Sequence, residues 1–441
     1  MKAAGRLAAV SLGWIVCALP AHAQDALRLT LADAQARALQ ASHRLAELQA
    51  REAAAEATAD VRAAASQPNV SVLAGYTRTN HVRQFFVPGP SNTRPLLIYP
   101  DVPDNWRTRL DLQWPIYTGG RTDALERAAR AEAAAVGADL DAARGDLRLE
   151  VARAFWALVT ARSSVGVLER AVERANTHVA DVRQRLQAGL VPPNEVASAE
   201  AQASRERMLL IEAANQRDLA SSDVARLIGE SVLRPIEPVD PLDTPSAGSA
   251  DMQALVAEAQ AERSERAALE RRVESAEARR TAAAAGTLPV ISIGGGFDYA
   301  RPNPRIFPRA DRWDDSWDAS VNLTWSLWDG GRTKAEVAEA AASAGAVRQR
   351  LAEFDSVLAL EVRQRLLEIE SGRAAIAAAD DAVRSAEEAR RVVAERFAAG
   401  VVTHTEVLDA QLALLQAELD RTRAQATVRL AEARLARAVG R

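Results

Sequence analysis

The chain has 441 residues, of which 48% are hydrophobic, 26% are charged and only 4% are aromatic, and its formal net charge is −4. This balance argues against a nucleic-acid binder, because such proteins usually carry a strongly basic surface. The composition is rich in Ala, Arg, Glu and Leu, which favours long packed helices over several compact globular domains.

The N-terminus predicts an export signal (residues 1–23). Two basic residues precede the apolar stretch 7–19, and a small-residue cleavage site follows it. The apolar stretch is too short to span a bilayer, so we expect Gln24 to be the mature N-terminus. Removal would leave 53 basic against 59 acidic residues, a net charge of −6. The only cysteine, Cys17, lies in this segment, so the mature chain would have no thiol chemistry.

A helix and two strands are predicted next. Thr30 is suited to cap a helix that runs to about Ala65. Apolar residues then occupy alternate positions over 70–76, and a loop (79–104) follows. Apolar and polar residues alternate again between Trp106 and Ile116. Such alternation is typical of a strand with one apolar and one polar face.

The segment 122–187 then predicts one unbroken helix, because it contains no proline and keeps an apolar face. At 1.5 Å per residue it would reach roughly 100 Å. So long a helix needs coiled-coil-like partners. The chain turns at Gly189 and runs back as a helix to about residue 229. No further stretch has 18 uninterrupted apolar residues, so we expect no helical membrane span.

The second half repeats the first. The segment Trp114-Pro-Ile-Tyr-Thr-Gly-Gly-Arg-Thr122 returns, shifted by 211 residues, as Trp325-Ser-Leu-Trp-Asp-Gly-Gly-Arg-Thr333. A constant offset over more than a hundred residues indicates two copies of one large unit. We therefore expect repeats at 24–229 and 251–441, joined by a Pro-rich linker at 230–250.

The four predicted strands, two in each repeat, fit the pattern of outer-membrane barrels. Tryptophans concentrate in and beside them, as an aromatic girdle would require: Trp106, Trp114, Trp317, Trp325 and Trp328. The alternative is a half-buried sheet in a soluble protein. Four strands cannot close a barrel that leaves no unpaired edge in lipid, so a barrel must be shared between chains.

In these features the chain resembles the outer membrane factor family, the TolC-like outer-membrane efflux proteins. The resemblance covers Leu29 to Gly440 and rests on the doubled strand-to-helix segments together with the doubled turns, 185–196 and 396–411. It implies a mainly α fold with some β structure: long helical hairpins form a periplasmic tunnel, and each chain of a homotrimer gives four strands to one twelve-stranded barrel.

The same resemblance implies the function. Such a protein lies in the outer membrane of a Gram-negative bacterium, contacts its lipid and extends into the periplasm. It is a passive exit duct of a tripartite efflux or type I secretion system, working with a periplasmic adaptor and an inner-membrane pump of RND or ABC type. It would be no enzyme and would bind no cofactor, metal or nucleic acid.

Three carboxylates near the turns are candidates for the periplasmic aperture that acidic residues line in the family. Glu406 and Asp409 stand three residues apart and would share one helix face. Glu195 is the counterpart of Glu406 in the first repeat, whereas Ser198 stands at the position of Asp409. Helix capping is the alternative for the two glutamates. Capping does not explain Asp409.

The turns themselves are candidates for adaptor contact. Arg185 and Arg396 each stand four residues before the turn glycines Gly189 and Gly400, and in the family this tip meets the adaptor. The alternative is an arginine that only favours the helix dipole. We expect both glycines to be left-handed C-caps. Val402 stands where the family often places a basic latch residue.

Other signals favour no chemistry. The five histidines are scattered through the sequence, and we expect them on the solvated surface. The three glycines at 294–296 are better explained as small residues on a barrel wall than as a phosphate loop. Two rival classes remain. A periplasmic adaptor would have one helical hairpin flanked by β domains, and a soluble secreted coiled-coil scaffold would not require detergent.

Overall fold

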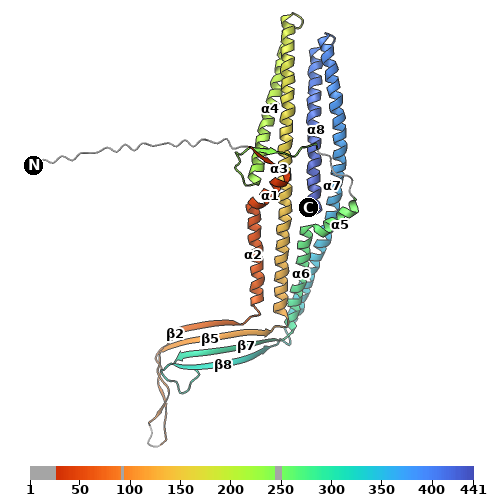
Figure 1. Cartoon of the computed structure of the whole chain (residues 1–441). Helices are drawn as coiled ribbons and strands as arrows, with labels where there is room; N and C mark the ends of the chain where they lie inside the picture. The colour runs from red at the N-terminus through yellow and green to blue at the C-terminus, as the bar shows by residue number, and fades with distance from the viewer. Residues whose placement is uncertain (1–25, 91–93, 244–250) are drawn as a thin grey trace, which may run out of the picture.

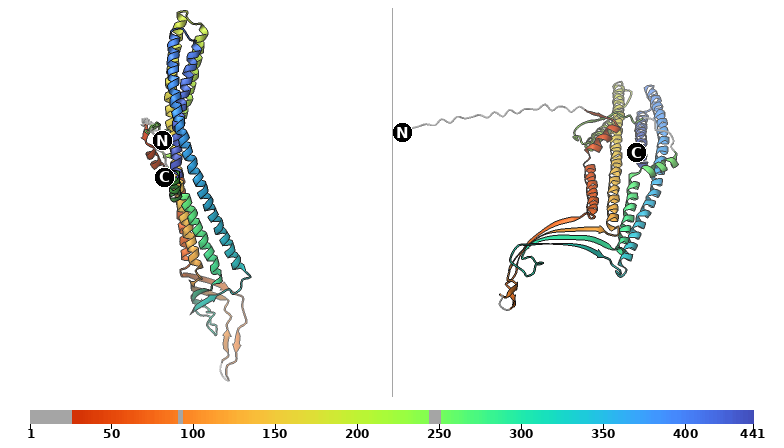
Figure 2. Two further views of the ribbon diagram at one scale, coloured as in Figure 1. Left: turned by 90° about the vertical axis from the view of Figure 1, so that its right-hand side faces the viewer. Right: turned by 60° about the horizontal axis from the view of Figure 1, so that its bottom comes forward.

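The computed structural model describes residues 26–90, 94–243 and 251–441, and the predicted export signal lies outside them. Two long helical hairpins lie side by side, and a sheet leaves their common end at a steep angle (Figures 1 and 2). The first hairpin is α3 (Arg121–Gln187) with α4 (Pro193–Leu227), and the second is α7 (Arg332–Ala398) with α8 (His404–Ala438). The free tips of the hairpins lie at the end opposite the sheet.

The sheet has four antiparallel strands in the order β2 (Asn69–Arg78), β5 (Asp104–Tyr117), β7 (Val290–Arg301) and β8 (Asp314–Thr324). Its register brings the predicted apolar positions of all four strands onto one face. One row across that face is Val72, Leu110, Phe297 and Trp317. The predicted alternation is therefore confirmed.

In each repeat, the Gly-Gly-Arg-Thr segment connects the second strand of the sheet to the long helix. Both glycines of the second copy have positive φ, 68° at Gly330 and 89° at Gly331. The carboxylate of Asp329 accepts hydrogen bonds from the backbone N–H groups of Gly331 at 3.0 Å and Thr333 at 2.8 Å. These bonds satisfy donors that the first turn of α7 would leave unpaired. The long helices begin one residue earlier than predicted and have 67 residues each.

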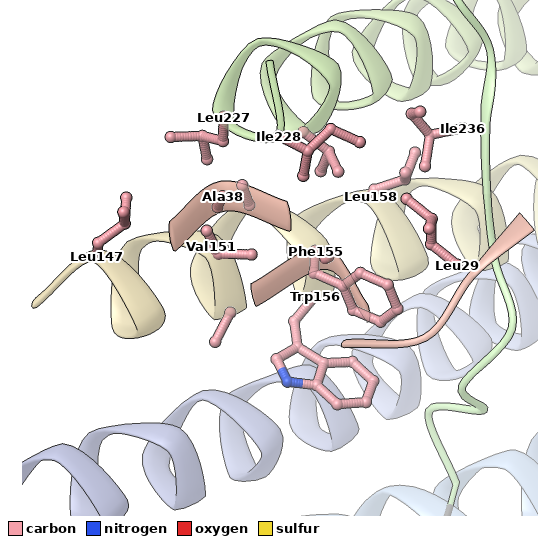
Figure 3. Packing of buried hydrophobic residues seen from close by; sticks show 14 of the residues in the cluster. Leu29, Ala38, Leu147, Val151, Phe155, Trp156, Leu158, Leu227, Ile228 and Ile236 are labelled. Carbon is pink, nitrogen blue, oxygen red and sulfur yellow. The ribbon is translucent and has the colours of Figure 1, made fainter. Parts of the chain in front are cut away.

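The main core lies halfway along α3. Val151, Phe155 and Leu158 of this helix are fully buried against α1 (Leu31–Ala41), the end of α4, and a small parallel sheet of β1 (Leu27–Leu29) and β6 (Ile236–Pro238), as Figure 3 shows. The second repeat has a smaller version, in which α5 (Met252–Glu262) packs on α7. Both cores fix the N-terminal helices of each repeat against the long hairpins.

Two local predictions were wrong in detail, and the linker contains a strand that was not predicted. The helix expected from Thr30 to Ala65 is interrupted at Ser42, whose hydroxyl caps a second helix, α2 (His43–Ala64). The loop 79–104 contains a short hairpin of β3 (Phe85–Val87) and β4 (Leu96–Tyr99). The described part of the linker contributes β6, which pairs with β1. Each difference depends on a tertiary contact or a cap that overrides the local pattern.

The two repeats agree in register as well as in order. Tyr76 pairs with Trp106 on β5, and Phe297 pairs with Trp317 on β8. These pairs correspond under offsets of 221 residues before the loop and 211 after it, because the loop of the second repeat is ten residues shorter. Helix α6 (Ser264–Ala284), followed by a short 3-10 turn (Ala285–Thr287), is the counterpart of α2.

One described helix, α3, is long and apolar enough to cross a membrane by length and composition alone. Its most apolar 18-residue window has a mean hydropathy of 1.2, and 56% of that window is buried inside the chain. Core helices of soluble proteins meet the same criterion, so this is weak support for a helical span. The core contacts of α3 described above account for its apolar face.

Candidate functional site: the hairpin tips and the sheet

Both hairpin tips end in the same left-handed cap. Gly189 and Gly400 have φ values of 74° and 73°. The N–H of Leu190 donates to the Arg185 carbonyl, and the N–H of Val401 donates to the Arg396 carbonyl, both at 2.9 Å. This is the Schellman arrangement, in which a residue with positive φ closes the helix. The predicted role of the two glycines as left-handed C-caps is confirmed.

The carboxylates near the tips have three different environments. Glu406 is exposed and accepts hydrogen bonds from the N–H and the hydroxyl of Thr403, both at 3.3 Å, so it completes a capping box. Asp409 is exposed, one turn further along α8, and its carboxylate makes no hydrogen bond or ion pair within the described residues. Capping therefore uses Glu406 and leaves Asp409 available.

Glu195 differs from its counterpart Glu406. The residue that caps α4 is Pro192, which has no side-chain donor or acceptor, so no capping box can form there. The Glu195 side chain is half-buried, and its Oε2 has no hydrogen-bond partner among the described residues. Its charge acts on His404 of the other hairpin. Glu195 thus faces the boundary between the two hairpins.

The two tip arginines also differ. Arg185 lies over the Phe397 ring, with its guanidinium carbon 4.3 Å from the ring centroid, and donates to the Phe397 carbonyl at 2.9 Å. It therefore joins α3 to the C-terminal end of α7, where a cation also favours the helix dipole. Arg396 is exposed, and its guanidinium makes no hydrogen bond or ion pair in the described part of the chain.

An apolar cluster closes the space between the tips. Val182, Phe397 and Val407 are buried in it, and Val402 packs against them. The cluster joins α3 of the first hairpin to α7 and α8 of the second. Val402 therefore contributes packing at the position where the family often has a basic latch.

The prediction that all histidines are solvated was wrong for two of them. His178 of α3 and His404, the first residue of α8, are 7% and 4% exposed. His178 Nε2 and His404 Nδ1 are 2.8 Å apart, and the rings stack with centroids 4.8 Å apart. The two residues are 226 positions apart in the sequence, and no local pattern indicates that they meet.

Burial acts on the titration of both rings. It lowers the pKa of His178 to about 4, and the neighbouring His404 lowers it further while Asp181 opposes the change. Burial likewise lowers the pKa of His404, with Glu195 acting in the opposite direction. Both rings are therefore neutral at pH 7, one nitrogen donating the shared hydrogen bond and the other accepting it.

At the sheet, the predicted girdle tryptophans stand at its two ends. Trp106 and Trp317 lie near the end remote from the helices, eight residues before Trp114 and Trp325 respectively. Eight residues span about 26 Å of strand, which rises about 20 Å at a barrel tilt of about 40° and is comparable to the roughly 25 Å apolar band of outer-membrane barrels. All five predicted tryptophans are exposed, and Trp328 lies beyond the end of β8.

The polar face of the sheet carries an ion network that the sequence did not reveal. The Arg109 guanidinium crosses from β5 over β7 and donates to Asp298 at 2.6 Å, Asp318 at 2.9 Å and Asp111 at 3.0 Å. A Cβ at Gly296 would lie 2.1 Å from Arg109 Nη2. The glycine therefore leaves the space that the arginine occupies.

The described residues contain no group of three or more His, Cys, Asp or Glu side chains arranged to hold a metal ion. The described residues do form an amphipathic sheet with open edges and a pair of helical tips. A comparison with protein-family models shows which family has this combination of features. The outer membrane efflux protein model matches residues 35–230 and 255–441.

This chain belongs to the outer membrane efflux protein family. Solved channels share its fold. OprN has a TM-score of 0.77 at 20% identity, covering 93% of this chain and 89% of its own. VceC from Vibrio cholerae has 0.76 at 21%, covering 93% and 96%. The open state of MtrE from Neisseria gonorrhoeae has 0.77 at 20%, covering 93% and 88%. None of the curated proteins matches the chain.

Family membership fixes the coarse function. The outer membrane efflux protein described here lies in the outer membrane of a Gram-negative bacterium and acts there as an export channel, a transport duct and not an enzyme. The helical hairpins extend away from the sheet (Figure 1). The rival adaptor and soluble scaffold interpretations are thereby excluded.

Proposed function

We propose that three copies of the chain form one continuous duct, which receives substrates from an inner-membrane pump through a periplasmic adaptor. The observation that carries this proposal is the open sheet. Its strands β2 and β8 are edge strands, and its apolar face is exposed. Unpaired backbone groups in lipid cost several kcal/mol each, so these edges need partners. Three copies would give twelve strands and six helical hairpins.

Charge complementarity supports a second copy as the neighbour of α7. Within the chain, Arg170 of α3 donates to Glu418 of α8 at 3.4 Å. The 211-residue shift places Asp381 of α7 and Arg207 of α4 at the corresponding positions, with the signs reversed. Arg207 is exposed and has no polar partner among the described residues. In a ring, Asp381 would meet Arg207 of the next copy.

We place the periplasmic aperture at the hairpin tips. Asp409 supports this assignment, because it is exposed beside the tip and no capping bond uses its carboxylate. Three-fold symmetry would bring three such carboxylates into one ring, where they attract cations and oppose anions. Glu406 and Glu195 stand nearby and would add charge to the same narrow region.

The tips are also the surface that we assign to the adaptor. Arg396 and the cap at Gly400 are exposed and available, whereas Arg185 is occupied by Phe397. The first-repeat tip at Gly189 would thus offer mainly backbone and apolar contacts. The pump, of RND or ABC type, would supply the energy for transport.

The aperture is tested by changing Asp409 and its counterpart in opposite directions. Asp409→Ala removes one charge per chain, so cations are held less tightly in the narrow ring. In planar bilayers the variant should therefore raise single-channel conductance and weaken block by multivalent cations. Ser198→Asp adds a carboxylate at the duplicated position and should strengthen that block. Asp60→Ala, a change of the same charge on α2 near the sheet, is the control. Unchanged conductance and block in both tip variants would refute the aperture assignment.

A further inference from the structure

The buried histidine pair lies where the two hairpins of one chain meet. His178 belongs to α3 and His404 begins α8, so their hydrogen bond connects the first hairpin to the second. The Phe397 ring of α7 also lies against His178, at a centroid distance of 5.5 Å. Arg185 reaches the same phenylalanine from one side. The contact is thus part of the interface between α3 of the first hairpin and helices α7 and α8 of the second. This interface is the seam between the two hairpins of one chain.

Charged groups on α3 and α4 act on this pair. On α3, Asp181 favours and Arg185 opposes protonation of His178. On α4, Glu195 favours protonation of His404. Arg174, one turn before His178, is paired with Glu418 of α8 at 3.0 Å. These effects are outweighed by burial in an apolar seam that has little room to hydrate a charge.

Two buried polar atoms near the pair have no hydrogen-bond partner among the residues that the structure describes. They are Nε2 of His404 and Oε2 of Glu195. A neutral His404 uses only Nδ1 in the observed contact, so its second nitrogen remains without a hydrogen bond in the closed seam. Protonation makes both nitrogens donors and adds a charge. Double protonation of the pair would place two like charges on stacked rings.

We propose that His178 and His404 form a proton-operated latch that holds the two hairpins of each chain together and releases them on acidification. This inference rests on the proposed role of the tips as the aperture. The ligand of the latch is the proton, and the element that responds is the α3–α8 seam. Release would free α8, and with it Asp409, to move relative to α3.

The latch is confined to the seam inside each chain. The 211-residue shift maps His178 onto Ala389 and His404 onto Pro193, neither of which can titrate. In a trimer, the seams between copies would therefore hold at low pH while the three internal seams open. This difference between two otherwise similar seams gives the protein a way to move one hairpin of each pair.

The direction of the pH effect follows from proton linkage. The closed seam lowers the pKa of His178 from 6.5 to about 4, so the open seam binds more protons. Closed-state stability is then fully present above pH 6.5 and is lost as the pH falls toward 4. At pH 5, His178 alone would shift the equilibrium toward the open seam by about 30-fold per chain.

The protonation of each ring can be measured without any assumption about transport. Hydrogen exchange at the imidazole C2 position, followed by mass spectrometry of the intact channel, gives a pKa for every histidine. We expect the titration midpoint of His178 to lie more than one pH unit below its ordinary value of 6.5. A His178 midpoint at 6.5 would overturn the proposal.

Channel recordings test the mechanical consequence. The wild-type channel should open more often at pH 5 than at pH 7.5 in planar bilayers. The double variant His178→Gln/His404→Gln keeps hydrogen-bonding groups and cannot titrate, so this difference should disappear. His43→Gln is the matched control and should keep it. The single variant His404→Gln provides a second test if the double variant assembles poorly, and it should reduce the pH response.

The outcomes separate the latch from the aperture. A pH response that persists unchanged in the histidine variants overturns the latch, whatever Asp409→Ala does. A response that is lost in the histidine variants, together with an Asp409→Ala variant that conducts normally, supports the latch and rejects the aperture ring. A wild-type channel with no pH response also overturns the latch.

Discussion

At the scale of single residues, Gly296 illustrates how a missing side chain can determine an ion network. Its absence of Cβ lets Arg109 pass over β7 and reach Asp318 on β8. We predict that Gly296→Ala displaces the guanidinium and destabilises the protein by about 1.5–3 kcal/mol, the range for hydrogen bonds to charged groups. Thermal unfolding of the detergent-solubilised protein measures the effect.

The neighbouring glycine supplies the control. A Cβ at Gly295 points to the other face, where the nearest atom, the Asp318 carbonyl oxygen, is 3.5 Å away. Gly295→Ala should therefore leave the unfolding temperature nearly unchanged. Equal losses in the two variants would show that strand flexibility, and not the Arg109 network, explains the glycines.

The role of a residue could be predicted from the sequence where it depends only on neighbouring residues in the chain. The caps at Gly189 and Gly400 depend on a few neighbouring residues, and the sequence indicated them correctly. The histidine pair depends on a contact between positions 178 and 404 and has no local signal. For the same reason, the sequence could suggest a barrel wall for the three glycines but could not show Arg109 above one of them.

At the scale of helices, the backbone φ of a glycine should decide whether its replacement by alanine raises or lowers the stability of the protein. The room available for the added Cβ should matter less. A Cβ at Gly189 or Gly400 would meet nothing within 4 Å, yet both residues have positive φ. Alanine in this conformation costs about 1–2 kcal/mol. Gly189→Ala and Gly400→Ala should each lower stability by this amount in denaturant unfolding.

A glycine inside α3 should behave in the opposite way. At Gly166 a Cβ would lie 3.8 Å from Arg170 Nη1, an ordinary contact, and no positive φ is involved. Gly166→Ala should therefore raise stability by about 0.5–1 kcal/mol. If the Gly189→Ala and Gly400→Ala variants were as stable as Gly166→Ala, the positive φ of the two cap glycines would not be what makes glycine necessary at the hairpin turns.

Element types followed from the sequence, whereas interruptions did not. Period-two alternation and the lack of proline predicted the strands and the long helices, because both patterns extend over many residues. The break at Ser42 and the pairing of β1 with β6 each depend on one cap or one distant partner. A periodic pattern averages over many residues and does not indicate a feature that depends on one residue or one distant contact.

At the scale of the whole molecule, the duplication predicts how copies should pair. Within the chain β5 pairs with β7, and Leu110 stands opposite Phe297. The repeat offsets map β5 onto β8 and β7 onto β2. The same pair becomes Val321 and Tyr76 of the next copy. Both lie on the apolar face, and both belong to edge strands.

This register can be tested by cysteine crosslinking, since Cys17 in the predicted signal is the only native cysteine. Val321→Cys combined with Tyr76→Cys should give disulfide-linked oligomers in membranes under mild oxidation. Val321→Cys combined with Thr77→Cys should not, because adjacent strand residues point to opposite faces. Crosslinking of the second pair in place of the first would mean a slipped register and would break the near six-fold match. Crosslinking of the first pair alone would show that β8 of one copy pairs with β2 of the next in the register that the β5–β7 pairing predicts. The same duplicated unit would then form every strand pairing between repeats in the barrel.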